Sequence, residues 1–222
     1  MRVRTALSAA ALATTAALTM TACGGGSGGG NDKIPTTPST STTTAAAPTT
    51  APPSGAALKI DPALKLPADL TVTFDWTLPS DHNQAVALVA SADFIQAMTH
   101  AVVKQNTSDP VLAAYSAGDA LSFGKSYVQQ YVSHGWTLTG TDRYYSPKVQ
   151  LSSAKSSAQV TFCEDQSKVF GKVISTGKIL TTTPSDSSYV SYTITVSKLP
   201  VRTELWQAQS ITVKEKALQC KQ

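Results

Sequence analysis

One short run of the sequence could do chemistry, the segment 161–166 (TFCEDQ) of a chain of 222 residues. Cys163 is followed there by Glu164 and Asp165, so a thiol stands beside two carboxylates. Such a cysteine could ligate a metal, act as a nucleophile or form half of a disulfide. A structural zinc site usually needs four ligands, and a nucleophilic thiol needs a base held beside it. No CxxC or HxxxH spacing lies near Cys163, and no motif surrounds the three histidines, so we expect neither a metal site nor a catalytic residue.

The beginning of the chain predicts export. Arg2 and Arg4 precede an apolar, alanine-rich stretch over 6–19, which is typical of a secretory signal peptide over residues 1–22. The sequence Met-Thr-Ala-Cys, which ends at Cys23, resembles the bacterial lipobox, whose cysteine is diacylated. We therefore expect a lipid anchor on Cys23 that holds the protein at the outer face of the cytoplasmic membrane, with plain secretion as the alternative.

A long segment of low complexity follows. Residues 23–57 consist mainly of Gly, Ser, Thr, Pro and Ala, which bury too little apolar surface to fold, so we expect a disordered tether. The remaining residues, 58–222, have the length of a single domain. Lys and Arg total 18 against 14 Asp and Glu, without a basic run, so nucleic acid is not an expected partner.

Export bears on the role of Cys163. Cys220 is the other cysteine of the predicted domain, and exported domains normally oxidise such a pair. We therefore expect a disulfide between Cys163 and Cys220 that stabilises the domain by about 4 kcal/mol, with a metal site and a nucleophile as alternatives. Glu164 and Asp165 are then most simply the polar end of a strand.

Sequence periodicity divides the domain into helices followed by strands. The segment 70–76 alternates like a half-buried strand, and 82–104 carries an apolar stripe with a helical period. Two shorter helices are expected, one capped by Asp109 and one running from Asp119, its expected N-cap, to Gly135. Further strands are expected at 136–145, 148–152, 157–165, 189–198 and 203–213. Helices followed by antiparallel strands predict an α+β fold with the helices on one face of the sheet.

The order of several short motifs resembles a group of secreted lipoproteins from actinobacteria. The motifs are Tyr-x-x-Gly-Asp-Ala-Leu from Tyr115, Val-x-x-Cys-x-Asp from Val160, a strand with Trp206 and a final cysteine, Cys220. The resemblance implies an NTF2-like fold, in which a strongly bent antiparallel sheet wraps helices into a cone with a cavity. It implies no common activity.

If the cone holds a pocket, polar residues of the last strand are candidates for its lining. Gln207 and Gln209 interrupt the apolar face of 205–213, and buried amides must be hydrogen-bonded, so they could point at a ligand. Solvent exposure there, or a bulge that exchanges the two faces, is the alternative.

Other ligand-binding candidates lie outside that strand. Tyr115 and Asp119 belong to the helical part, where Asp119 suits a helix cap better than a pocket acid. The run 142–145 (DRYY) mixes charge with aromatic rings, which suits binding, but an exposed hairpin is the favoured interpretation.

These features favour a surface-tethered, non-enzymatic binding module for a small ligand or an envelope protein, without a cofactor. One alternative is an NTF2-like isomerase, dehydratase or hydrolase that pairs Asp119 or Asp142 with a histidine in the cone. Another is a structural spacer in an envelope complex.

Overall fold

The computed structural model describes residues 55–222. The predicted signal peptide, Cys23 and nearly all of the predicted tether lie outside the described residues. Gly55 donates a backbone hydrogen bond to Leu78, and Ala57 forms a β-bridge with Thr77. Contacts with the domain therefore begin before residue 58, inside the segment predicted to be tether.

Three helices follow the first strand, close to the predicted bounds: α1 (His82–Val103), α2 (Pro110–Tyr115) and α3 (Gly118–His134). Asp81 caps α1 by accepting a hydrogen bond from the backbone N–H of Gln84 at 3.0 Å, and Asp109 caps α2 through Val111 at 2.8 Å. Gly135 ends α3 in the left-handed conformation, as predicted.

The start of α3 differs from the prediction. Its N-cap is Ala117, which has no side-chain cap, and Asp119 lies exposed in the first turn, so the expected Asp119 cap is wrong. The backbone N–H of Ala117 bonds instead to the carbonyl of Ala208 at 2.8 Å, which ties the α2–α3 turn to the last strand. A tertiary contact thus replaces the local cap.

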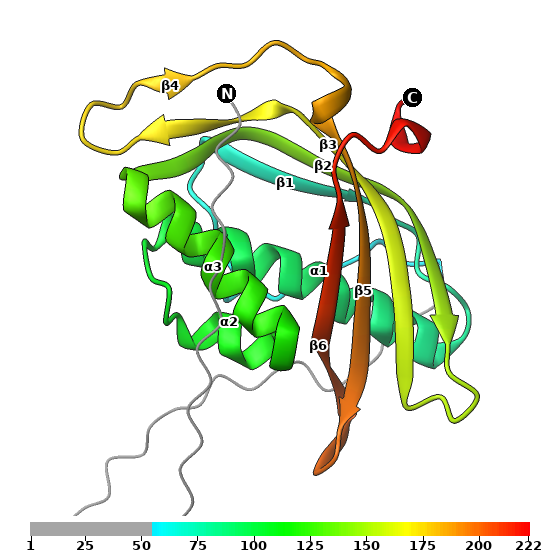
Figure 1. The fold of residues 1–222 in the computed structure, drawn as a ribbon. Helices are drawn as coiled ribbons and strands as arrows, with labels where there is room; N and C mark the ends of the chain where they lie inside the picture. Colours follow the sequence, from blue (N-terminus) through cyan, green and yellow to red (C-terminus); the bar gives the residue numbers. More distant parts are fainter. Residues whose placement is uncertain (1–54) are drawn as a thin grey trace, which may run out of the picture. The chain divides into compact units, whose positions relative to one another are not determined.

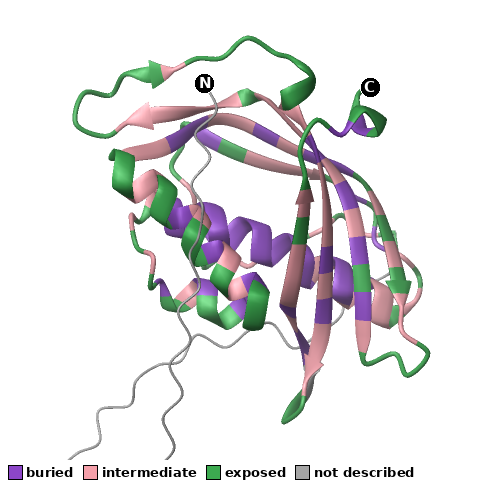
Figure 2. Ribbon diagram, in the orientation of Figure 1, coloured by how far each residue is buried: buried purple, intermediate pink, exposed green. Residues whose placement is uncertain are grey.

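The helix α1 is the core helix of the domain. Its length and hydropathy would suit a membrane span, but 83% of its most apolar window is buried. A helix that is apolar on all sides is normally enclosed by its own protein. Figure 2 shows this burial along α1, which packs against the inner face of the sheet.

Six strands of the described chain form one sheet: β1 (Leu70–Asp75), β2 (Trp136–Leu151), β3 (Ser157–Val173), β4 (Ile179–Leu180), β5 (Tyr189–Leu199) and β6 (Arg202–Lys214). Their order is β1-β2-β3-β5-β6, with β4 paired to β3, and the sheet curls around the helices (Figure 1). The α+β class is confirmed. The sheet is mixed and not wholly antiparallel, because the three helices form a crossover that brings β2 back parallel to β1.

Two strands are longer than predicted. The segments 136–145 and 148–152 form the single strand β2 with a register shift after Tyr145, and β3 continues to Val173. Near the start of β2, Gly140 has φ 98°, and a Cβ there would lie 2.2 Å from the carbonyl oxygen of Lys168. Glycine therefore permits the close approach of β2 and β3 where the sheet bends.

The disulfide closes a second, smaller cluster on the sheet face opposite the helices. Cys163 is bonded to Cys220 with a Cα–Cα distance of 5.5 Å, which confirms the predicted pair. Tyr145 packs there with Ala217 and donates a hydrogen bond to the carbonyl of Cys220. The staple thus holds the C-terminal tail on the sheet.

Candidate functional site

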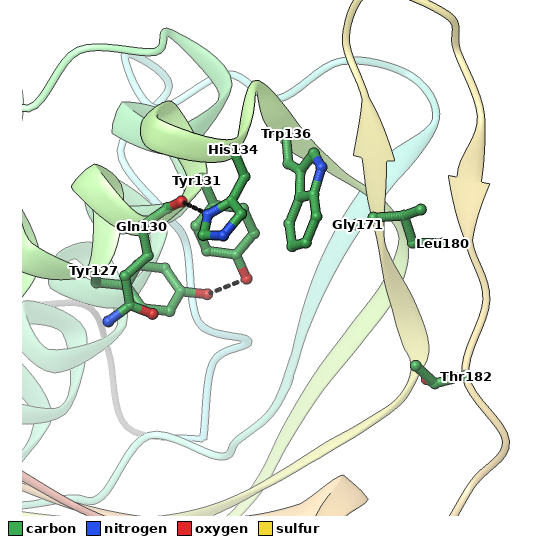
Figure 3. A pocket seen from close by; sticks show the side chains of 8 residues that line it. All are labelled: Tyr127, Gln130, Tyr131, His134, Trp136, Gly171, Leu180 and Thr182. Carbon is green, nitrogen blue, oxygen red and sulfur yellow. Dashed lines mark hydrogen bonds between the residues drawn. The ribbon is translucent and has the colours of Figure 1, made fainter. Parts of the chain in front are cut away.

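A pocket of about 420 Å³ opens between the C-terminal half of α3, the start of β2 and the β3–β4 hairpin (Figure 3). Ring side chains dominate its lining: Tyr127, Gln130, Tyr131, His134, Trp136, Gly171, Leu180 and Thr182. A pocket of this size can enclose a small organic molecule, and aromatic lining is usual for such sites.

The end of α3 positions these rings. Tyr127 and Tyr131 are one helical turn apart, so they share a face, and their hydroxyl oxygens are hydrogen-bonded at 3.3 Å. Gly135 turns the chain between His134 and Trp136, whose rings then lie 4.5 Å apart. The walls are therefore ring faces held by helix geometry and one turn.

A pair of buried carboxyl groups lies on the inner face of the sheet. Asp142 of β2 and Glu164 of β3 are both buried. The Tyr144 hydroxyl lies 2.9 Å from Oδ2 of Asp142 and 3.1 Å from Oε1 of Glu164. Tyr192 of β5 donates to Oε2 of Glu164 at 3.0 Å. Tyrosine hydroxyls from two strands therefore bond to the pair.

These contacts require a shared proton. The Tyr144 hydroxyl has one hydrogen and can fully satisfy only one carboxylate, so its other short contact needs a proton from a carboxyl group. Burial raises the pKa of Asp142 well above its usual range, and the charge of Glu164 raises it further. Burial also raises the pKa of Glu164, whereas its hydrogen bond with Asp142 lowers it. We place the proton on Asp142.

The carboxyl pair acts electrostatically on the tyrosines of the pocket. Burial raises the pKa of Tyr131, and the acidic pair of Asp142 and Glu164 raises it further. Burial is also the main cause of the raised pKa of Tyr127, to which Glu164 contributes. The pair thus acts on the tyrosine side of the pocket, although neither carboxylate belongs to the pocket lining.

A second carboxyl pair lies under the segment that precedes β1. The buried Asp93 of α1 accepts a hydrogen bond from the backbone N–H of Asp61 at 3.1 Å, and the Tyr115 hydroxyl donates to Asp61. Burial raises the pKa of Asp93 from 3.8 to about 7. Neither carboxylate lines the aromatic pocket.

The predicted glutamines lie outside the pocket. Gln207 donates to the carbonyls of Ala113 and Ala114 at 3.1 and 3.2 Å, and Gln209 donates to the carbonyl of Gln207. The register shifts next to Ala208, so the inward face changes there. The bulge alternative therefore describes this strand, and both amides serve the fold. Tyr115 and Asp119 also lie outside the pocket.

Two interpretations of the strands are wrong. The run 142–145 is no exposed hairpin, because Asp142 and Tyr144 are buried in mid-strand, and Glu164 is no polar strand end. The alternation of Val160, Phe162 and Glu164 carried a signal, since it puts this carboxylate on the apolar face. The pocket residues of α3 had no comparable signal.

The histidines form no acid–base pair with the candidate carboxylates. His82 is exposed, the Nδ1 of His100 lies 3.4 Å from Asp109, and the Nδ1 of His134 donates to the carbonyl of Gln130 at 2.7 Å. Over residues 55–222, no cluster of three His, Cys, Asp or Glu side chains is arranged to hold a metal ion.

Comparisons with known proteins give no family. No family model and no curated protein matches the sequence. Among solved structures, the intermembrane space region of the chloroplast protein ARC6 is similar over 56% of this chain and 94% of that chain, with 10% identity and a TM-score of 0.37. This likeness carries no inference about function.

Proposed function

We propose that the domain is a non-enzymatic binding module that holds a small, largely apolar molecule in the pocket between α3 and the β3–β4 hairpin. The observation that carries the proposal is the 420 Å³ pocket with its walls of aromatic rings. A spacer domain needs no such cavity, and the described histidines do not supply the base that the enzyme alternative requires.

The proposal includes an NTF2-like cone and a membrane tether. Three helices enclosed by a curled sheet support the cone. The signal-like start of the sequence, the lipobox-like Met-Thr-Ala-Cys and the low-complexity segment support a lipid anchor on Cys23 at the outer face of the cytoplasmic membrane.

Native mass spectrometry of the protein isolated from its producing cells tests the pocket. We expect an added mass that is lost on denaturation. In the Gly171→Leu variant the new side chain fills the pocket beside Leu180, so the added mass should disappear. Thr181→Leu is the matched control, because Thr181 is exposed on the same hairpin outside the lining and should keep the ligand. A ligand that Gly171→Leu still carries would overturn the proposed site.

A further inference from the structure

The pocket offers aromatic faces, and the buried carboxyl pair lies outside its lining but acts on two of its tyrosines. Tyr127, Tyr131 and Trp136 offer ring faces, and its lining within residues 55–222 contains no lysine or arginine. The same two tyrosines feel the charge of Glu164. Aromatic faces and carboxylates both attract positive charge.

Among the described ion pairs of residues 55–222, none involves Asp142 or Glu164. In the described part of the chain, hydrogen bonds to the carboxyl groups of Asp142 and Glu164 come from Tyr144, Tyr192, the pair itself and the backbone N–H of Arg143. Oδ1 of Asp142 is buried and accepts no hydrogen bond from the described backbone or from a neutral side chain. An unpaired buried charge is unfavourable, so the pair retains a proton. A cation that formed a salt bridge with the pair could take the place of this proton.

We propose that the ligand of this pocket is a small organic ammonium ion with an apolar body, whose charge replaces the proton shared by Asp142 and Glu164. This inference rests on the proposed binding function and adds the ligand class. The apolar body lies against Trp136, and the ammonium group lies at the Tyr127 and Tyr131 hydroxyl oxygens, which accept its hydrogen bonds.

Binding is then an exchange of one proton for one cation. The ammonium ion enters, the Asp142 carboxyl proton passes to solvent, and no covalent bond to carbon changes. The ionisable groups around the pair are Tyr127 and Tyr131 from α3, Tyr144 from β2, Tyr192 from β5 and Asp165 from β3. Burial holds the pKa values of these tyrosines above their usual range, so the pair is the source of the proton.

Three indole probes of matched size and different charge test this class: tryptamine, tryptophol and indole-3-acetate. The ¹⁵N-labelled protein is titrated at pH 8, and binding is followed at the indole N–H of Trp136. Tryptamine should bind about tenfold more tightly than tryptophol, and indole-3-acetate should bind most weakly. Calorimetry in phosphate and in Tris should show proton release with tryptamine only.

Two isosteric variants locate the effect. In Asp142→Asn and Glu164→Gln we expect the preference for tryptamine to fall to about twofold or less and the proton release to disappear. Glu215→Gln, which removes an exposed carboxylate elsewhere, should behave as wild type. If a variant does not fold, the wild-type protein still provides a test. Because binding releases a proton, the affinity of the wild type for tryptamine should be weaker at pH 5 than at pH 8.

The outcomes separate the two proposals. Tryptophol that binds as tightly as tryptamine, at the Trp136 signal, would overturn the ammonium class and leave the binding function standing. Three probes that all leave the Trp136 signal unchanged would overturn both.

Discussion

The two carboxyl pairs of this domain, Asp61 with Asp93 and Asp142 with Glu164, differ in what bonds to them. Asp93 bonds to the backbone N–H of Asp61 and so fixes the segment before β1 to α1. Asp142 and Glu164 bond to the side chains of Tyr144 and Tyr192, and they act on the tyrosines of a pocket that they do not line. A carboxyl group that accepts a backbone hydrogen bond serves the fold, whereas we propose that the pair that shares a proton and acts on the pocket tyrosines serves a ligand.

Asp93 and the Asp142–Glu164 pair predict the same unusual pH dependence of stability. Between its unfolded and folded pKa values, a carboxyl group with a raised pKa keeps a proton in the folded state that the unfolded state has lost, so stability falls as pH rises. For Asp93 this window runs from 3.8 to about 7 and is worth at most about 4 kcal/mol. Urea unfolding should therefore show lower stability at pH 8 than at pH 5.

Asp93→Asn sharpens this prediction. The amide oxygen can still accept the Asp61 N–H but cannot ionise, so the variant should lose much of the decline between pH 5 and pH 8. Urea unfolding at both pH values checks it against Asp119→Asn, which alters an exposed carboxylate. A variant with the full wild-type decline would show that Asp93 does not cause it.

Removal of the disulfide separates stability from binding. Cys163→Ser with Cys220→Ser should lower the free energy of unfolding by about 4 kcal/mol, because the unfolded chain regains its entropy. The staple lies on the face opposite the helices, so tryptamine affinity below the unfolding transition should not change. Urea unfolding and NMR titration measure the two effects. A parallel loss of affinity would mean that stability alone controls the pocket.

Matched tyrosine substitutions give the smallest effects. Tyr115→Phe removes a donor to Asp61, and Tyr192→Phe removes a donor to Glu164. Each should cost about 1 kcal/mol in thermal unfolding, the typical value of one hydrogen bond. Of the two, only Tyr192→Phe should change the proton release on tryptamine binding. Equal effects of both variants on that release would remove the distinction between the pairs.

Local signals made much of the helical part and the disulfide predictable. The residues that begin and end the helices bond to residues close in sequence, as at Asp81, Asp109 and Gly135. Cys163 had only one possible disulfide partner in the predicted domain, Cys220. Where a cap depended on tertiary contact, as at the start of α3, the prediction was wrong.

The site depended on strand register, which the sequence does not display. Shifts near Thr141 and Ala208 decide which side chains face inward, so Asp142 was interpreted as exposed and Gln207 as a pocket candidate. Whether β1 pairs with β2 in parallel or antiparallel depended on the crossover through the three helices. The lipid anchor on Cys23, the NTF2-like assignment and the binding function stay predictions.

The most direct test compares the affinity of Asp142→Asn and Asp93→Asn for tryptamine at pH 8, in parallel with wild type. We expect Asp142→Asn to bind tryptamine about tenfold more weakly than wild type, and Asp93→Asn to bind it like wild type. Equal affinities in the two variants would mean that the Asp142–Glu164 pair has no special role in ligand binding.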